Sequence, residues 1–155
     1  MSPQQLFDGA QTPDDLARPL YGARFPDACR RYFRNYATFT GRASRSEYWW
    51  AFAMQGLAML VGLILVWIGA ALMATSQSAG NAVIWSGVVA MTAVVIACLV
   101  PNLAISWRRL HDTNLGGPMY FLSCIPYLGG LILLILLAMP SKPEGRRFDL
   151  PRWPR

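Results

Sequence analysis

Two short polar segments carry most of the side chains that could do chemistry in this sequence. Residues 108–112 (RRLHD) hold two arginines, the single histidine and an aspartate, and residues 41–47 add two arginines and a glutamate. Arginine forks match phosphate oxygens, and a basic pocket between helices suits anionic lipid head groups. We therefore hypothesise an anion or lipid head-group site, the arginine collar. Its candidate donors are Arg42, Arg45, Arg108 and Arg109. Its orienting or pairing residues are Glu47, His111 and Asp112.

The same segments also suit a purely structural role, which we favour for the cluster as a whole. Arginines and His111 at a helix C-terminus complement the helix dipole. Asp112 starts a turn through residues 113–117, but its charge is unfavourable at that helix end unless it is paired. The candidate partners of Asp112 are Arg42, Arg45 and Arg108.

Enzyme chemistry finds little support in these residues. His111 is the only histidine, and the chain has no Ser/His/Asp or HExxH pattern. A histidine and an aspartate adjacent on a helix point in different directions. Cys29, Cys98 and Cys124 lack metal-ligand spacing and are interpreted as packing residues. We predict no enzyme activity, no metal and no cofactor.

Long uncharged stretches flank the polar segments. No charged residue occurs in 48–107 or in 113–141, and 54% of the 155 residues are hydrophobic against 14% charged. Soluble domains carry roughly 25% charged residues. Because the apolar residues come in blocks, they indicate membrane spans. The net charge of +6 lies outside these blocks, which favours membrane orientation over nucleic-acid binding.

These patterns predict an all-α integral membrane protein. We expect about three transmembrane helices, the third kinked or re-entrant, and an N-terminal amphipathic interfacial helix. The expected organisation is a flexible polar leader (1–24), a single membrane domain (25–141) and a basic polar tail (142–155). Within the domain we expect the interfacial helix at about 26–37 and spans at about 48–73, 82–108 and 118–139.

Local signals support the start of the membrane domain. The Ser44-x-x-Glu47 spacing predicts a capping box directly before the first span. An aromatic stripe beside arginines favours a helix in the head-group layer, the alternative being a helix packed on the rest of the protein. The expected interfacial anchors are Tyr32, Phe33, Tyr36, Trp49 and Trp50.

The third apolar run leaves the topology open. Pro126 and Gly129-Gly130 interrupt it, so it either spans with a kink, which we favour, or enters the membrane and returns. Arginines before the first span and after the second predict a cytoplasmic N-terminus. The basic tail disagrees if the third run spans, so the side of the tail stays undecided.

Three motifs resemble a bacterial inner-membrane family catalogued as domain of unknown function 805. They are TFTGRASRSEYWW at 38–50, SWRRLHDTN at 106–114 and IPYLGGLI at 125–132. The resemblance implies a small multi-pass protein of the bacterial inner (plasma) membrane, and it brings no established activity.

We therefore expect a membrane scaffold, accessory or partner-binding protein whose cytoplasmic arginine collar binds anionic lipid head groups. The alternative is an oligomeric transporter or channel component, although the spans lack the ionisable groups typical of ion pathways. A membrane enzyme is the weakest reading. The expected partners are the lipid bilayer, anionic phospholipid, and a second copy or another membrane protein, but no nucleic acid.

Overall fold

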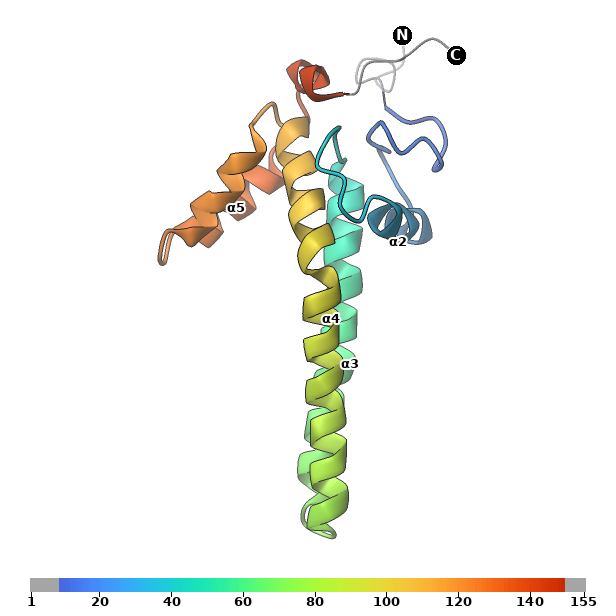
Figure 1. The fold of residues 1–155 in the computed structure, drawn as a ribbon, viewed down its shortest axis with the longest axis vertical. Coiled ribbons are helices and arrows are strands. Elements are labelled where there is room, and N and C mark those ends of the chain that lie inside the picture. Colours follow the sequence, from blue (N-terminus) through green and yellow to red (C-terminus); the bar gives the residue numbers. More distant parts are fainter. Residues whose placement is uncertain (1–8, 150–155) are drawn as a thin grey trace. The chain divides into compact units, whose positions relative to one another are not determined.

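The computed structural model describes residues 9–149, and every regular element in that range is a helix (Figure 1). The α-helices are α2 (Phe25–Arg34), α3 (Arg45–Leu72), α4 (Gln77–Asp112) and α5 (Gly129–Ala138), and the 3-10 helices are η1 (Gly117–Cys124) and η2 (Pro143–Phe148). The predicted all-α class is therefore confirmed. The chain divides into two compact units, Phe52–Leu99 and Met1–Ala51 together with Val100–Arg155.

Two helices are long and apolar enough to cross a membrane, namely α3 with 28 residues and α4 with 36. At ~1.5 Å per residue, α3 is about 42 Å long, which exceeds a hydrocarbon core of ~30 Å. Most of their apolar side chains are exposed, unlike those of a core helix in a soluble protein. α4 starts five residues before the expected position 82 and extends through the RRLHD segment.

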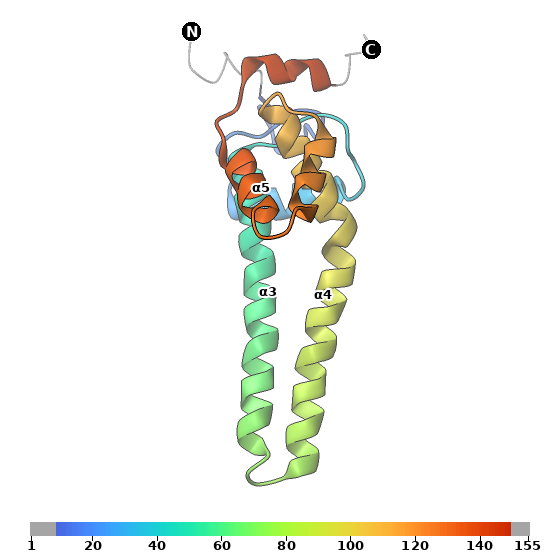
Figure 2. The same ribbon diagram turned by 90° about the vertical axis from the view of Figure 1, so that its left-hand side faces the viewer.

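The unit Phe52–Leu99 is an antiparallel hairpin of the two helices, joined by a short turn (Figure 2). Glycines let the backbones meet. A Cβ atom at Gly87 would lie 2.7 Å from the carbonyl oxygen of Gly62, and one at Gly69 would lie 2.8 Å from that of Gly80. Small residues at such crossings allow the close packing that associates helices in lipid.

In the other unit, the third apolar run returns instead of continuing as one helix (Figure 2). η1 and α5 pack side by side, and a Cβ atom at Gly129 would lie 2.1 Å from the carbonyl oxygen of Leu122. With 10 residues, α5 is about 15 Å long, too short for a ~30 Å core. Of the two alternatives left by the sequence, the structure has the returning one, and the favoured kinked span is wrong.

The returned run packs on the start of α3 and the end of α4. Its core consists of Leu110, Leu133 and Leu137, with Tyr48, Leu115, Tyr120 and Leu136 packed against it. After α5 the chain passes the end of α4, where the backbone N–H of Lys142 donates to the carbonyl of Asp112 at 2.8 Å. The described part of the tail therefore belongs to the same unit as the RRLHD segment.

The N-terminal helix buries an arginine together with part of its aromatic stripe. Its buried side chains are Ala28, Arg31 and Tyr32, followed by Asn35 just after the helix. Phe33 is 51% exposed and Tyr36 40% exposed. We expected a flexible leader, whereas residues 9–24 form a loop bonded to α2 and α3. The leader residues 1–8 and the tail residues 150–155 lie outside the described part of the chain.

Candidate functional site

A reciprocal capping box starts α3. Ser44 Oγ accepts the backbone N–H of Glu47 at 3.2 Å, and Glu47 Oε2 accepts the backbone N–H of Ser44 at 2.7 Å. The predicted box is therefore confirmed. Directly before it, the backbone N–H of Ala43 donates to the carbonyl of Arg108 at 3.0 Å. The segment before α3 is thus bonded to the last turns of α4, and the two halves of the collar meet.

Arg31 pairs with the capping carboxylate and holds the leader loop. Its Nε donates to Glu47 Oε1 at 2.5 Å. Its remaining nitrogens donate to the carbonyls of Pro13 at 3.0 Å, Asp15 at 2.6 Å and Arg18 at 2.5 Å. Arg31 was not among the predicted site residues, because it lies on another face of the helix than the aromatic stripe. Its partner is one of the predicted orienting residues, Glu47.

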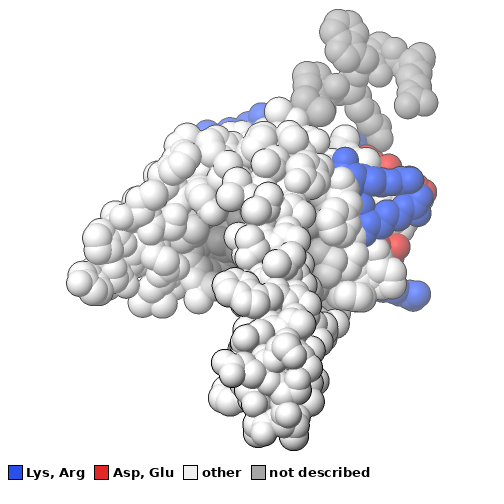
Figure 3. Space-filling view, turned by 60° about the horizontal axis from the view of Figure 1, so that its bottom comes forward, with Lys and Arg blue, Asp and Glu red and all other residues white. Residues whose placement is uncertain are grey.

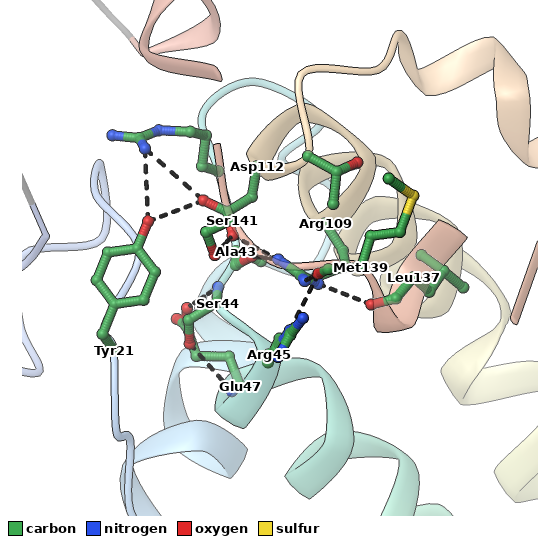
Figure 4. Close-up of polar contacts among 12 residues, drawn as sticks. Tyr21, Ala43, Ser44, Arg45, Glu47, Arg109, Asp112, Leu137, Met139 and Ser141 are labelled. Carbon is green, nitrogen blue, oxygen red and sulfur yellow. Dashed lines mark hydrogen bonds and ion pairs between the residues drawn. The ribbon is translucent and has the colours of Figure 1, made fainter. Parts of the chain in front are cut away.

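Asp112 is the centre of the buried polar cluster (Figure 4). The side chain of Asp112 is fully buried and accepts hydrogen bonds from the hydroxyl of Tyr21 at 2.9 Å, the hydroxyl of Ser141 and Nη1 of Arg109. Nη1 of Arg42 lies 3.7 Å from the same carboxylate. Of the three partners expected for Asp112, the structure pairs it with Arg42 and adds Arg109, which was not among them.

Arg109 closes the C-terminal end of α5 (Figure 4). The last carbonyls of a helix have no partner within it, and arginine side chains can supply donors. Arg109 Nε donates to the carbonyl of Leu137 at 2.9 Å, and its Nη2 donates to that of Met139. The exposed Arg45 adds a bond from Nε to Met139 O at 3.0 Å. Two collar arginines therefore fasten the returned run to the ends of α3 and α4.

Arg42 fastens the tail. Its Nε and Nη2 donate to the two carboxylate oxygens of Asp149 at 2.8 and 2.6 Å, a bidentate pair. Burial alone would lower the pKa of Arg42, but the hydrogen bonds and charge of Asp149 outweigh it and raise the pKa. Burial, and then the charge of Asp112, raise the pKa of the Tyr21 phenol. Both shifts keep these donors protonated around the carboxylates.

His111 also contacts the tail. Its Nδ1 lies 3.0 Å from the carbonyl oxygen of Gly41 and donates to it, because a carbonyl only accepts. The imidazole stacks on the ring of Phe148, with 4.1 Å between centroids and 3° between planes. Gly41 has φ +79°, and its N–H donates to the carbonyl of Phe148 at 3.0 Å. His111 is thus held between the loop before α3 and the tail.

The collar arginines fall into two groups. Arg42 and Arg109 are buried, and their N–H groups donate hydrogen bonds to Asp149, Asp112 and backbone carbonyls. Arg45 is exposed, and Arg108 is 2% exposed with an Nε that has no hydrogen-bond partner among the described residues. The expected anchors divide too. Tyr32 is buried, and its hydroxyl donates to Asn102 Oδ1 at 2.9 Å, whereas Phe33, Tyr36, Trp49 and Trp50 are exposed.

The cluster is suited to holding chain segments together. Its carboxylates accept from arginines, hydroxyls and backbone N–H groups, and its arginines cap a helix end and the tail. Residues 9–149 contain no group of three His, Cys, Asp or Glu side chains that could hold a metal ion. What the cluster offers to a ligand is positive charge.

A chain whose regular elements within residues 9–149 are all helices, with two long apolar helices that carry no charge over 52–99, is an integral membrane protein. Comparison with known proteins agrees. The chain is similar to inner membrane protein YhaH of Escherichia coli strain K12, with 32% identity over 120 residues, or 76% of this chain and 89% of that protein. It is also similar to inner membrane protein YhaI of the same strain, with 29% identity over 116 residues, or 74% and 86%.

Residues 36–150 match the family described as "Protein of unknown function (DUF805)", and the chain belongs to that family. The resemblance stated from the motifs is therefore confirmed. No solved structure matches this chain. Neither the family description nor the relatives' names assigns a catalytic activity.

Proposed function

We propose that this protein is a scaffold or accessory protein of the bacterial inner membrane whose basic end binds anionic phospholipid head groups. The observation that carries the proposal is the gathering of exposed positive charge in one unit. Seven exposed basic residues belong to it: Arg24, Arg30, Arg34, Arg45, Lys142, Arg146 and Arg147. The exposed acidic residues among those described are Asp14 and Glu144. Figure 3 shows part of this basic surface in blue.

The proposed topology has two spans, α3 and α4, with both ends of the chain in the cytoplasm. Lysine and arginine are enriched in cytoplasmic segments next to spans. The turn between α3 and α4 has none, whereas arginines precede α3 and end α4. Because the third run returns, Lys142, Arg146 and Arg147 join the same side. The tail's charge, which conflicted with a third span, now supports a cytoplasmic N-terminus.

The proposed lipid contacts use the exposed basic side chains rather than the buried arginines. The side chains of Arg42 and Arg109 hold chain segments together, and Asp112 and His111 fix the positions of those segments. Arg45 and the tail residues present exposed cations, each worth about 1 kcal/mol near an anionic surface. α2 and the turn after it add exposed Phe33 and Tyr36 close in sequence to Arg30 and Arg34, as in a helix lying in the head-group layer.

Native mass spectrometry of purified protein with phosphatidylglycerol or phosphatidylcholine tests the proposal. We expect the wild type to retain phosphatidylglycerol preferentially. Replacing Arg45, Lys142, Arg146 and Arg147 together by glutamine should reduce that preference. The matched control replaces the three arginines by lysine, which keeps the charge. Equal retention of the two lipids by the wild type would refute lipid-head-group selectivity.

The scaffold role is separable from the transport alternative. The unit Phe52–Leu99 contains no charged residue, and ion or proton pathways usually require ionisable groups within the spans. Stable co-purification of a membrane partner, or of a second copy, would support the scaffold. Solute or ion flux in liposomes that contain only the purified protein would refute it.

A further inference from the structure

The buried polar cluster contains one more arginine than it has carboxylates. Its buried arginines, each at most 2% exposed, are Arg31, Arg42, Arg108 and Arg109. The carboxylates are Glu47, Asp112 and Asp149, paired in turn with Arg31, Arg109 and Arg42. Four cations against three anions leave one positive charge. Within residues 9–149 no carboxylate lies within 4 Å of Arg108, so the surplus charge belongs to it.

The guanidinium of Arg108 also has a donor without an acceptor. Its Nε is buried and lacks a hydrogen-bond partner among the described residues, as does Nδ2 of Asn35 at the end of α2. The third buried side-chain atom without a partner among the described residues is an acceptor, Oδ1 of Asn114, which lies in the turn after α4. Buried polar groups in folded proteins nearly always have partners, so an orphaned donor on a charged group indicates a missing acceptor.

Glu47 does not fill this role. Its Oε1 accepts Arg31 Nε, and its Oε2 accepts the backbone N–H groups of Leu20 at 3.1 Å and Ser44 at 2.7 Å. The carboxylate is therefore committed to the capping box and the leader loop. A buried water could accept a hydrogen bond from Arg108, but it would leave the positive charge uncompensated, which is costly in a buried setting.

We infer that Arg108 takes a phosphate group as its counter-ion. The Nε edge of a guanidinium presents two parallel N–H donors that match two phosphate oxygens, and phosphate is the anion of the head-group layer. The source is either the phosphodiester of an anionic lipid or free inorganic phosphate. In its lipid form the inference rests on the proposed function and assigns one head group to an enclosed position, distinct from the exposed cations.

Thermal unfolding of the delipidated full-length protein in a neutral detergent tests the inference. The probes are inorganic phosphate, phosphatidylglycerol, and chloride at matched ionic strength. The variant is Arg108→Met, which removes the charge but keeps an unbranched side chain. Replacing an unpaired buried charge by an apolar group is usually tolerated, so this variant should fold. Arg18→Met is the matched control, because Arg18 is a half-buried arginine of the same unit that is not among the proposed lipid contacts.

We expect phosphate or phosphatidylglycerol at about 100-fold excess over its dissociation constant to raise the wild-type midpoint by roughly 5–10 °C. Arg18→Met should keep the shift, and Arg108→Met should lose it. A response to phosphate identifies free phosphate as the source, and a response to phosphatidylglycerol alone identifies the head group. The inference is overturned if chloride shifts the midpoint equally, if neither probe shifts it, or if Arg108→Met responds like the wild type.

The two proposals fail in different ways. Loss of lipid selectivity in the glutamine variant of the exposed residues, with an unchanged Arg108-dependent shift, supports both. Lack of lipid selectivity in the wild type together with a phosphate shift that requires Arg108 refutes the proposed function only. Lipid selectivity without any dependence on Arg108 refutes the enclosed phosphate only.

Discussion

Neutralising Asp112 should destabilise the protein far more than neutralising an exposed carboxylate with similar partners. The side chain of Asp112 is fully buried, accepts three hydrogen bonds and faces the guanidinium groups of Arg42 and Arg109. Asp112→Asn preserves the shape but removes the charge, which leaves the buried guanidinium of Arg109 without a carboxylate, whereas Arg42 keeps Asp149. Breaking a buried ion pair from one side costs about 3–5 kcal/mol. For a chain of this size that corresponds to a lower midpoint by about 6–20 °C.

Asp14→Asn is the matched control, since Asp14 also faces two arginines. Its carboxylate lies 3.2 Å from Arg30 and 2.6 Å from Arg34, but its side chain is 64% exposed. Exposed pairs contribute about 0.2–1 kcal/mol each, so the midpoint should fall by only a few degrees. The assay is thermal unfolding of both variants in the same detergent. A midpoint for Asp112→Asn within error of that for Asp14→Asn would refute the role assigned to the buried cluster.

Three further predictions concern other parts of the chain. Gly69→Ala brings a Cβ atom to 2.8 Å from a carbonyl oxygen of the facing helix. It should lower the free energy of unfolding by about 1–3 kcal/mol, measured by denaturant unfolding. The control Gly56→Ala places its Cβ atom where nothing lies within 4 Å, so it should be neutral or slightly stabilising. The raised pKa of Tyr21 means that the unfolded chain releases this proton first. Stability should therefore fall as pH rises above about 10, and Tyr21→Phe should flatten that slope in pH-dependent melting. Reporter fusions after Thr75 should read as periplasmic and those after Asn114 as cytoplasmic; the reverse pattern would contradict the orientation.

Signals that act between near neighbours could be read from the sequence. The capping box is a contact between residues three apart, so the Ser44 and Glu47 identities were sufficient to place it. The two long helices follow from uninterrupted apolar stretches. The RRLHD segment was recognised as a boundary because charge returns there after 60 uncharged residues, 48–107.

Contacts between distant residues could not be read in this way. The predicted face of α2 followed the aromatic residues Tyr32, Phe33 and Tyr36, but the buried face also includes Arg31 and Asn35. An arginine on a helix is normally expected to face solvent. Arg31 is buried because Glu47 and three leader carbonyls supply acceptors, and those partners lie 13 to 18 residues away. The helix was therefore expected in the right place, but the burial of Arg31 was not predicted.

The returning third run shows why the sequence left the topology open. A kinked span and a returning hairpin have the same apolar composition, so hydropathy does not separate them. The difference lies in where the last carbonyls of α5 find donors, because an apolar helix end without partners is costly in lipid. Arg109 and Arg45 supply those donors at Leu137 and Met139.

Two of the three motifs on which the family resemblance rests, 38–50 and 106–114, bond to the same neighbouring segments. The segment before α3 supplies Arg42 to the tail and Arg45 to α5, and the segment ending α4 supplies Arg109 to α5 and Asp112 to Arg42. Each of these side chains is accounted for by closing the returned run and the tail onto the ends of the two long helices. The side chain of Arg108 lies in the same motif and is equally buried, but its Nε has no hydrogen-bond partner among the described residues. Three of the four buried guanidinium groups have a carboxylate partner, and the fourth, that of Arg108, has none among the described residues, which is the observation that supports the proposed phosphate site.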